Sequence, residues 1–285
     1  GAGLIGGSVG IALRKQGWTV AMSDLDPDLP QQAIRVGAAD EAGFDPGSEL
    51  VVVATPVGAI PELALDALAR CEGAVTDVGS TKADVCQAVI HPRFVGGHPM
   101  AGSEQDGLIG AREDMFAGAM WVLTPTENTD EAAFATVRAM VRSIGAETIA
   151  LPPEVHDQLV AQVSHVPHLT AATLMNLADA SSVEHRALLR LAAGGFRDMT
   201  RISAGRPSIW PDICIGNSKA IVDGLDRLIG ALSDVRNRVA NHDREGILML
   251  LTRARQARLN LPVGFGPSDN LVEVAVTIPD RPGEI

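Results

Sequence analysis

Apolar and polar residues follow two different patterns in the two parts of the chain. Up to residue 151, short apolar runs alternate with stretches in which apolar residues recur every three or four positions. A continuous run such as 50–54 is typical of a strand buried on both faces, and the intervening period is that of a helix. From about residue 154 to 259, after Pro152 and Pro153, only the helical period remains. The pattern therefore predicts an α/β fold with a doubly wound, mostly parallel sheet, followed by an all-α domain.

The same pattern places the individual elements. Strands are expected at 18–23, 50–54, 73–77, 94–97, 120–123 and 147–151, and helices at 4–16, 58–69, 83–90 and 130–144. The strand at 94–97 ends at two glycines, so it is expected to release His98 into a loop. Ser80 and Thr81 are candidate caps of the helix that follows them, since hydroxyl side chains are favoured there.

A glycine motif opens the chain. The first six residues, from Gly1 to Gly6, match G-x-G-x-x-G and lead into the first helix. The first glycine permits a tight turn, the second lets the backbone approach a pyrophosphate, and the third allows close packing of helix and strand. Asp24, 18 residues after Gly6, ends the next strand, where an acid binds the ribose hydroxyls and repels a 2′-phosphate. We therefore expect a Rossmann-type site for NAD, with candidate contacts Gly1, Gly3, Leu4, Ile5, Gly6, Asp24, Thr55 and Pro56.

Three regions follow from these elements. Residues 1–151 are expected to form the NAD-binding domain, with its first strand missing because the first residue already belongs to the glycine motif. Residues 152–261 are expected to form a helical substrate and dimerisation domain, since long apolar helices such as 221–239 need a partner surface. Residues 262–285 contain a linker rich in Pro and Gly and then a new strand pattern at 270–278 that stops midway. Both ends are therefore expected to be cut.

Composition excludes several classes of function. The 285 residues carry a net charge of −12, which argues against nucleic-acid binding because a phosphate contact surface needs clustered Lys and Arg. No apolar run approaches the ~18–20 residues that span a bilayer. The three cysteines, Cys71, Cys86 and Cys214, have no metal-site spacing. Reduced thiols in a cytoplasmic protein are the simplest expectation.

The segment from Phe94 to Glu104 holds the first candidate for chemistry. His98 follows a short apolar strand, and Ser103 and Glu104 follow a turn of small residues. In an open α/β sheet, ligands bind beyond the carboxyl ends of the strands. Histidine titrates near neutrality, which suits it to proton transfer. On this segment alone, a catalytic base and a loop histidine that caps a backbone group are both open.

Two further candidates lie in the helical region. His165 and His168 form a His-x-x-His pair that could hold a metal, but no HExxH pattern is present, and His98 and His156 lack the spacing of a third ligand. No metal is therefore predicted. Pro167 is expected to bend this helix, with His168 the better candidate to face the cleft. Arg201 is either a surface ion-pair partner or the two-pronged donor that a carboxylate substrate requires.

Six motifs in this order resemble the prephenate/arogenate dehydrogenase family of tyrosine biosynthesis. They are the glycine motif with Asp24, Gly79-Ser80-x-Lys82, the loop from Gly97 to Glu104, Ser164-His165-x-Pro167-His168, the segment from Gly195 to Arg201, and Trp210-x-Asp212. Residues 272–283 are similar to the first strand and turn of an ACT domain, a regulatory module of some members of the family. One departure is Arg206 before Pro207, where relatives often have a small or acidic residue.

The resemblance implies the NAD-dependent oxidative decarboxylation of prephenate to 4-hydroxyphenylpyruvate, or of arogenate to tyrosine. It implies that His98 takes the proton of the ring hydroxyl, that Ser80 orients that hydroxyl, and that Arg201 binds a substrate carboxylate. Further pocket residues that it implies are His168, Ser164, Ser103, Glu104, Asp198 and Trp210. It also implies a homodimer formed through the helical domain and regulation by tyrosine through the ACT-like module.

Two other functions remain open at this point. A β-hydroxyacid dehydrogenase also joins a Rossmann domain to helices, but it relies on a lysine in its first interdomain helix, and the helix from Glu154 onward has none. An NAD-sensing regulator with an amino-acid-binding module would need no acid–base histidine beside a carboxylate-binding arginine. Formation of NADH from prephenate and NAD distinguishes all three.

Overall fold

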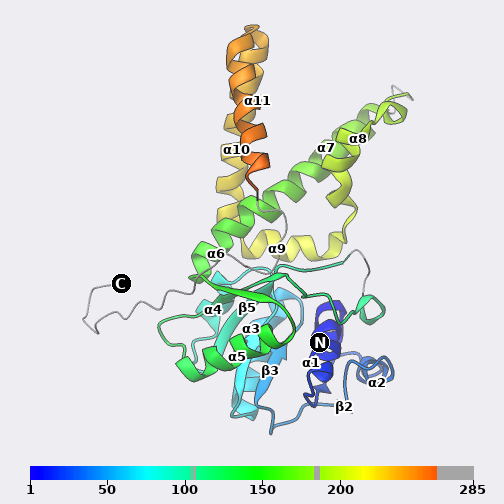
Figure 1. Cartoon of the computed structure of the whole chain (residues 1–285), viewed down its shortest axis with the longest axis vertical. Coiled ribbons are helices and arrows are strands. Elements are labelled where there is room, and N and C mark those ends of the chain that lie inside the picture. The colour runs from blue at the N-terminus through cyan, green and yellow to red at the C-terminus, as the bar shows by residue number, and fades with distance from the viewer. Residues whose placement is uncertain (104, 106, 183–186, 262–285) are drawn as a thin grey trace, which may run out of the picture.

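The structure is a computed structural model that describes residues 1–103, 105, 107–182 and 187–261. It has a sheet-containing domain, which holds the N-terminus, and a helical domain that extends away from it in two arms (Figure 1). The prediction of a Rossmann-type domain followed by an all-α domain is confirmed. The ACT-like segment, residues 262–285, lies outside the described residues.

The main sheet has five strands in the order β3-β4-β5-β6-β7. All neighbours are parallel except β5 and β6, which are antiparallel. The doubly wound, mostly parallel sheet is thus confirmed, with one antiparallel pair. The strands are β3 (Leu50–Val53), β4 (Ala74–Asp77), β5 (Phe94–Pro99), β6 (Met120–Thr124) and β7 (Glu147–Ala150).

Helices cover both faces of this sheet. On one face, α1 and α5 bury Leu13, Val137 and Met140 against strand residues such as Trp121. On the other face, a second apolar cluster that includes Ile60 of α3 packs on the sheet. The helices of this domain, including two short 3-10 turns, are α1 (Leu4–Lys15), α2 (Leu29–Arg35), η1 (Val57–Ala59), α3 (Ile60–Arg70), α4 (Ala83–Ala88), η2 (Leu108–Gly110) and α5 (Glu131–Ser143).

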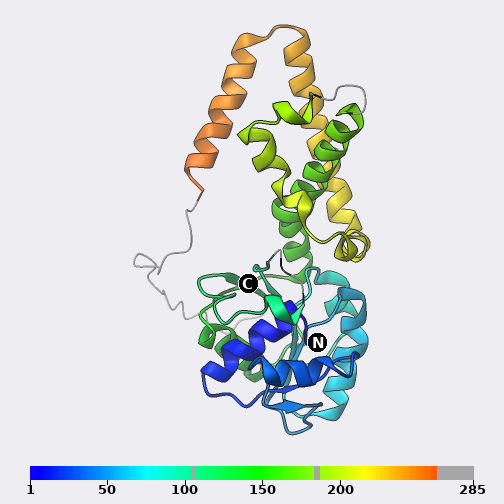
Figure 2. The same cartoon turned by 90° about the vertical axis from the view of Figure 1, so that its right-hand side faces the viewer.

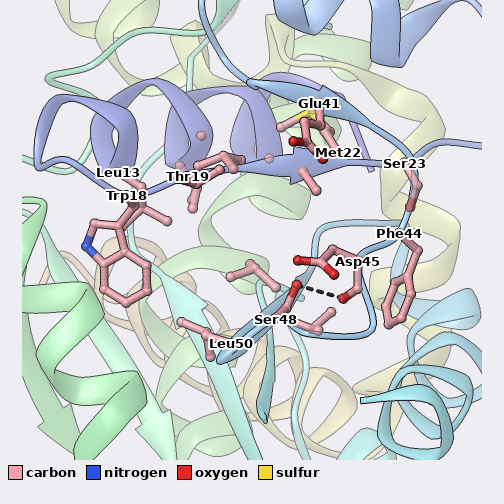
Figure 3. A pocket seen from close by; sticks show the side chains of 18 of the residues that line it. Leu13, Trp18, Thr19, Met22, Ser23, Glu41, Phe44, Asp45, Ser48 and Leu50 are labelled. Carbon is pink, nitrogen blue, oxygen red and sulfur yellow. Dashed lines mark hydrogen bonds between the residues drawn. The ribbon is translucent and has the colours of Figure 1, made fainter. Parts of the chain in front are cut away.

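A separate pair of short parallel strands, β1 (Ala21–Met22) and β2 (Glu41–Ala42), lies beside α1. A cavity of about 490 Å³ separates β1 from β3, the edge strand of the main sheet in the described part of the chain, with Leu13, Trp18 and Leu50 among its lining residues (Figure 3). Only Ala21 and Met22 of the strand expected at 18–23 have a strand partner.

The helical domain begins directly after β7. Two of its helices, α10 and α11, form an antiparallel hairpin that projects away from the sheet domain in both views (Figure 2). Among the described residues, no helix is both long enough and apolar enough to cross a bilayer. The elements are α6 (Pro153–Val160), the π-helical turn η3 (Ala161–His165), α7 (Val166–Ser182), η4 (Leu189–Leu191), α8 (Gly194–Thr200), η5 (Arg201–Ala204), η6 (Pro207–Ile209), α9 (Trp210–Gly216), α10 (Ser218–Ala240) and α11 (Arg244–Leu259).

The structure corrects two sequence-based expectations near the predicted site. His98 is not released into a loop, because β5 continues to Pro99 and His98 pairs with Val122 of the antiparallel strand β6. Neither Ser80 nor Thr81 is the N-cap of α4, which is Lys82, and the Lys82 side chain makes no capping hydrogen bond. In both cases the partner lies far away in the sequence: His98 pairs with Val122, and the backbone N–H groups at the start of α4 donate to the Asp157 carboxylate.

Candidate active site

The glycine turn at the start of α1 combines close packing with one open position. A Cβ atom on Gly6 would lie 2.0 Å from the carbonyl oxygen of Gly1, and one on Gly1 would lie 2.0 Å from that of Ala54. A Cβ atom on Gly3, the N-cap of α1, would meet nothing within 4 Å. The first N–H groups of α1, from Leu4 and Ile5 onward, have no intrahelical acceptor and suit an anion. The open space therefore lies where a pyrophosphate would meet the helix N-terminus.

Asp24 and Thr55 flank this turn. Asp24 accepts hydrogen bonds from the backbone N–H of Ala2 at 2.7 Å and from that of Asp26 at 3.0 Å. Thr55, before Pro56, follows β3 and lies beside Gly1, and its buried hydroxyl has no hydrogen-bond partner among the described residues. An unpaired buried hydroxyl costs free energy unless a ligand or water satisfies it. The turn, the carboxylate and the free hydroxyl together fit a dinucleotide.

A buried ion pair joins the turn that carries Ser80 to the strand that carries His98. The Asp77 carboxylate, at the end of β4, accepts hydrogen bonds from the backbone N–H of Gly79 at 2.8 Å and from that of Gly97 at 3.0 Å. The Lys82 ammonium also binds this carboxylate, and both side chains are fully buried. The pair therefore fixes Ser80 and His98 relative to each other through the residues next to them.

His98 lies half-buried near the end of β5, with its ring against that of His156 in the first helix of the helical domain. Burial is the main cause that lowers its pKa well below the usual value of 6.5, and His156, Lys82 and His165 add to the effect. A neutral imidazole at neutral pH has a free lone pair for a proton. His98 is thus in the protonation state that a general base requires.

Sequence reasoning missed the closest partners of His98. The Nδ1 atom of His98 lies 2.9 Å from Nε2 of His156, and Nδ1 of His156 lies 2.8 Å from Oδ1 of Asp157. The sequence pattern brings in His156 only as a candidate third metal ligand. The sequence held one indication of this contact, the position of His156. His156 and Asp157 form a His-Asp pair near the start of the first interdomain helix, which follows directly on the sheet.

The helical side of the site is a continuous row of rings. His165 lies at the end of the π-helical turn, and its Nδ1 atom is 3.3 Å from Nδ2 of Asn217. Burial lowers the pKa of His165 to about 4. The Trp210 ring lies edge-on to His165 at 6.0 Å and stacks on His168 at 3.7 Å between ring centres. His165 is therefore the packing residue, and half-buried His168 forms an outer wall with Trp210.

A π-helical turn, Ala161–His165, begins the segment that carries His165 and His168. Pro167 has no backbone N–H, and the irregularity expected near it takes the form of the π-helical turn directly before it. A π turn rotates the following residues relative to a regular helix, and such turns are frequent at functional sites. Ser164 lies within this turn and is half-buried.

The remaining predicted pocket residues are Arg201, Asp198, Ser103 and Glu104. Arg201 begins η5, which packs against α7, the helix that carries His168. Asp198, on α8, and Ser103 are exposed, and the Ser103 hydroxyl accepts a hydrogen bond from the backbone N–H of Gln105. Glu104 lies outside the described residues. The contribution of these four side chains to a substrate pocket stays a prediction.

Within the described residues, no group of three or more His, Cys, Asp or Glu side chains is arranged to hold a metal ion. The described groups include a glycine turn that suits an anion, the Asp24 carboxylate beside it, and His98 with its ring against that of His156. Together with the two-domain fold, the glycine turn and Asp24 define a nicotinamide-dependent dehydrogenase.

Comparison with known proteins gives the family. A model described as prephenate dehydrogenase, nucleotide-binding domain, matches residues 9–150, and one described as prephenate dehydrogenase, dimerization domain, matches residues 152–253. The prephenate dehydrogenase of Bacillus subtilis is 34% identical over 100% of the chain and 81% of its own length. The chain belongs to the prephenate dehydrogenase family.

Solved structures agree with this assignment. The prephenate dehydrogenase of Aquifex aeolicus, in complex with hydroxyphenyl propionate and NAD+, matches with a TM-score of 0.86 and 27% identity over 92% of this chain and 96% of that one. The arogenate dehydrogenase of Synechocystis matches with a TM-score of 0.80 and 28% identity over 90% and 96% of the two chains. NAD is therefore the cofactor of the nucleotide-binding domain.

Proposed function

We propose that this protein catalyses the NAD-dependent oxidative decarboxylation of prephenate, with His98 as the general base. The observation that carries the proposal is how His98 is held: its ring lies 2.9 Å from Nε2 of His156, and the backbone N–H of the preceding residue, Gly97, donates to the Asp77 carboxylate of the Asp77–Lys82 pair. Ser80 lies on the turn that this network fixes. The family membership supports the reaction, and the lowered pKa of buried His98 supports its role as a base that is neutral at neutral pH.

The chemistry uses few protein groups. NAD, when bound, accepts the hydride that leaves the carbinol carbon of the cyclohexadiene ring. His98 takes the hydroxyl proton at Nε2, while Ser80 orients the hydroxyl. Loss of the ring carboxylate as CO2 sends its electron pair into the ring, and His98 returns the proton to the oxygen that becomes the phenol. Because aromatisation drives this step, no further protein group has to stabilise an enolate.

Arogenate is the second candidate substrate, and it differs from prephenate by an amine in place of the side-chain keto group. Similar proteins include both an arogenate dehydrogenase, from Synechocystis, and a cyclohexadienyl dehydrogenase, from Zymomonas mobilis, which is 29% identical over 92% of the chain and 94% of its own length. A β-hydroxyacid dehydrogenase is less well supported, because α6 (Pro153–Val160) contains no lysine. Prephenate is proposed first because it is the substrate named for the Bacillus subtilis relative.

The function is tested by following NADH with prephenate and with arogenate as alternative substrates. In the parent protein we expect turnover of prephenate at a higher kcat/KM than arogenate. In Arg201→Ala we expect the KM for prephenate to rise about ten-fold or more with a smaller change in kcat, because a lost carboxylate contact weakens binding of ground state and transition state alike. The KM for NAD should not change.

Arg201→Lys is the matched control, because it keeps the charge and removes the planar fork. Arg201→Lys should therefore lower the KM for prephenate only part of the way from the Arg201→Ala value to the parent value. If neither substrate gives NADH, the proposed function is wrong. An unchanged KM for prephenate in Arg201→Ala would remove Arg201 from the substrate site and leave the rest of the proposal intact.

We also propose a homodimer formed through the helical domain. Residues 152–253 match a dimerization domain, and the α10–α11 hairpin exposes large apolar side chains, among them Ile229, Leu248 and Met249, each at least 60% exposed. Exposed apolar patches of this kind are typical of interfaces. Light scattering should give twice the monomer mass, and Leu248→Glu should shift the protein toward monomer. A parent protein that is monomeric at micromolar concentration would contradict the proposal.

Two remaining hypotheses concern the cell and regulation. The described cysteines Cys71, Cys86 and Cys214 are free thiols, which supports the proposal of a cytoplasmic enzyme. Binding of tyrosine by an ACT-like module depends on residues 262–285, so this hypothesis lies outside the described residues.

A further inference from the structure

His156, the histidine that contacts His98, has no role in the reaction proposed for His98 and Ser80. His156 is fully buried at the start of the helical domain, and its ring lies 5.1 Å from that of His98 at an angle of 72°. This edge-on arrangement directs one ring nitrogen of His156 at His98 and the other at Asp157. The three side chains form one hydrogen-bonded row.

The protons of this row can be assigned from its far end. Asp157 accepts the backbone N–H of Lys82 at Oδ1 and that of Ala83 at Oδ2, so both carboxylate oxygens already act as acceptors. An ionised carboxylate can only accept, and Nδ1 of His156 must therefore carry the proton that it donates to Asp157. In a neutral imidazole the other nitrogen, Nε2, is then an acceptor.

The same reasoning fixes His98. Because Nε2 of His156 accepts, Nδ1 of His98 must donate, and the lone pair of His98 lies on Nε2. This is the nitrogen that does not face His156. The row thus selects the one tautomer of His98 whose free lone pair is available to a substrate hydroxyl.

Resting on the proposed function of His98, we propose that His156 is a positioning residue that holds this base in the Nδ1–H tautomer. Asp157 anchors the His156 ring, because the Asp157 carboxylate accepts hydrogen bonds from the backbone N–H groups of the two residues that follow Ser80 and Thr81. Asn217 of the helical domain donates to the backbone carbonyl of Asp157 at 2.8 Å and fixes the pair from the other side. One row of hydrogen bonds therefore joins the Ser80 turn, the base and the helical domain.

Two variants separate the positioning role from packing. His156→Leu removes the ring nitrogen that accepts the hydrogen bond from His98 and puts an apolar side chain of similar size in its place. His156→Gln removes the same ring but can place an amide oxygen near the former Nε2 position. We expect kcat to fall about ten-fold in His156→Leu, because most of His98 adopts the unproductive tautomer, and to recover largely in His156→Gln. The KM for NAD should change little in both.

The decisive readout is the tautomer itself. With ¹⁵N-labelled histidine, two-bond ¹⁵N–¹H NMR spectra of the parent chain should show His98 protonated at Nδ1, and His156→Leu should show a mixture of the two tautomers. A parent protein with His98 protonated at Nε2, or a His156→Leu variant with parental kcat, would overturn the proposal. Should prephenate not be turned over while the Nδ1–H tautomer is observed, the proposed function fails and the positioning role stands.

Discussion

Replacing His98 with asparagine is expected to lower kcat for prephenate by about 10²–10⁴-fold, the usual contribution of a general base. The amide cannot accept a proton, yet it fits the space of the imidazole and can still donate toward His156. NAD should bind as before, because the glycine turn and Asp24 lie in other elements. Steady-state NADH formation measures kcat, and fluorescence titration with NADH measures binding of the nicotinamide cofactor.

His242→Asn is the matched control for this variant. His242 is exposed in the turn between α10 and α11, and its φ of 52° is one that asparagine also adopts. It should leave both kcat and stability close to those of the parent. Activity of His98→Asn within a few-fold of the parent would show that another group takes the proton.

Replacing Lys82 with methionine is expected to reduce the free energy of unfolding by about 3–5 kcal/mol, because it leaves the Asp77 carboxylate buried without its counter-ion. Both side chains are fully buried, so water cannot replace the lost partner. The Ser80 turn and β5 meet at this carboxylate, and the variant should therefore also lose activity. Urea unfolding followed by fluorescence measures the loss of stability.

The double variant Asp77→Asn with Lys82→Met is the control for this prediction. It removes both charges, while the amide oxygen introduced at position 77 can still accept one backbone N–H. It should recover a large part of the lost stability, since replacing both members of a buried pair is often nearly neutral. A Lys82→Met variant that loses less than about 1 kcal/mol would mean that the buried carboxylate takes up a proton at little cost.

These predictions concern one small region in which the two domains meet. The Asp77–Lys82 pair holds the Ser80 turn and β5 together within the sheet domain. The His156–Asp157 pair then attaches the helical domain to the same turn and to His98. His98, the proposed base, is thus held by hydrogen bonds from both domains.

The sequence by itself determined the fold class, the cofactor and the identity of the proposed base. The first helix, its glycine turn and Asp24 lie within 24 residues, and their roles depend on local turn chemistry that a single sequence displays. Strand and helix periodicity likewise predicted five strands of the main sheet within about two residues, with β5 extending two residues farther than expected. His98 and Arg201 were found because motifs in a fixed order surround them.

Only the tertiary structure decided how His98 is held. Its pairing with Val122, its contact with His156 and the anchoring of Asp157 on Lys82 join residues that are 24, 58 and 75 positions apart. Hydrophobic periodicity and turn residues report the conformation of neighbouring residues, whereas these hydrogen bonds arise when a strand and an interdomain helix pack together. The residue proposed to perform the chemistry is therefore readable from the sequence, and the tautomer in which it is held follows only from the fold.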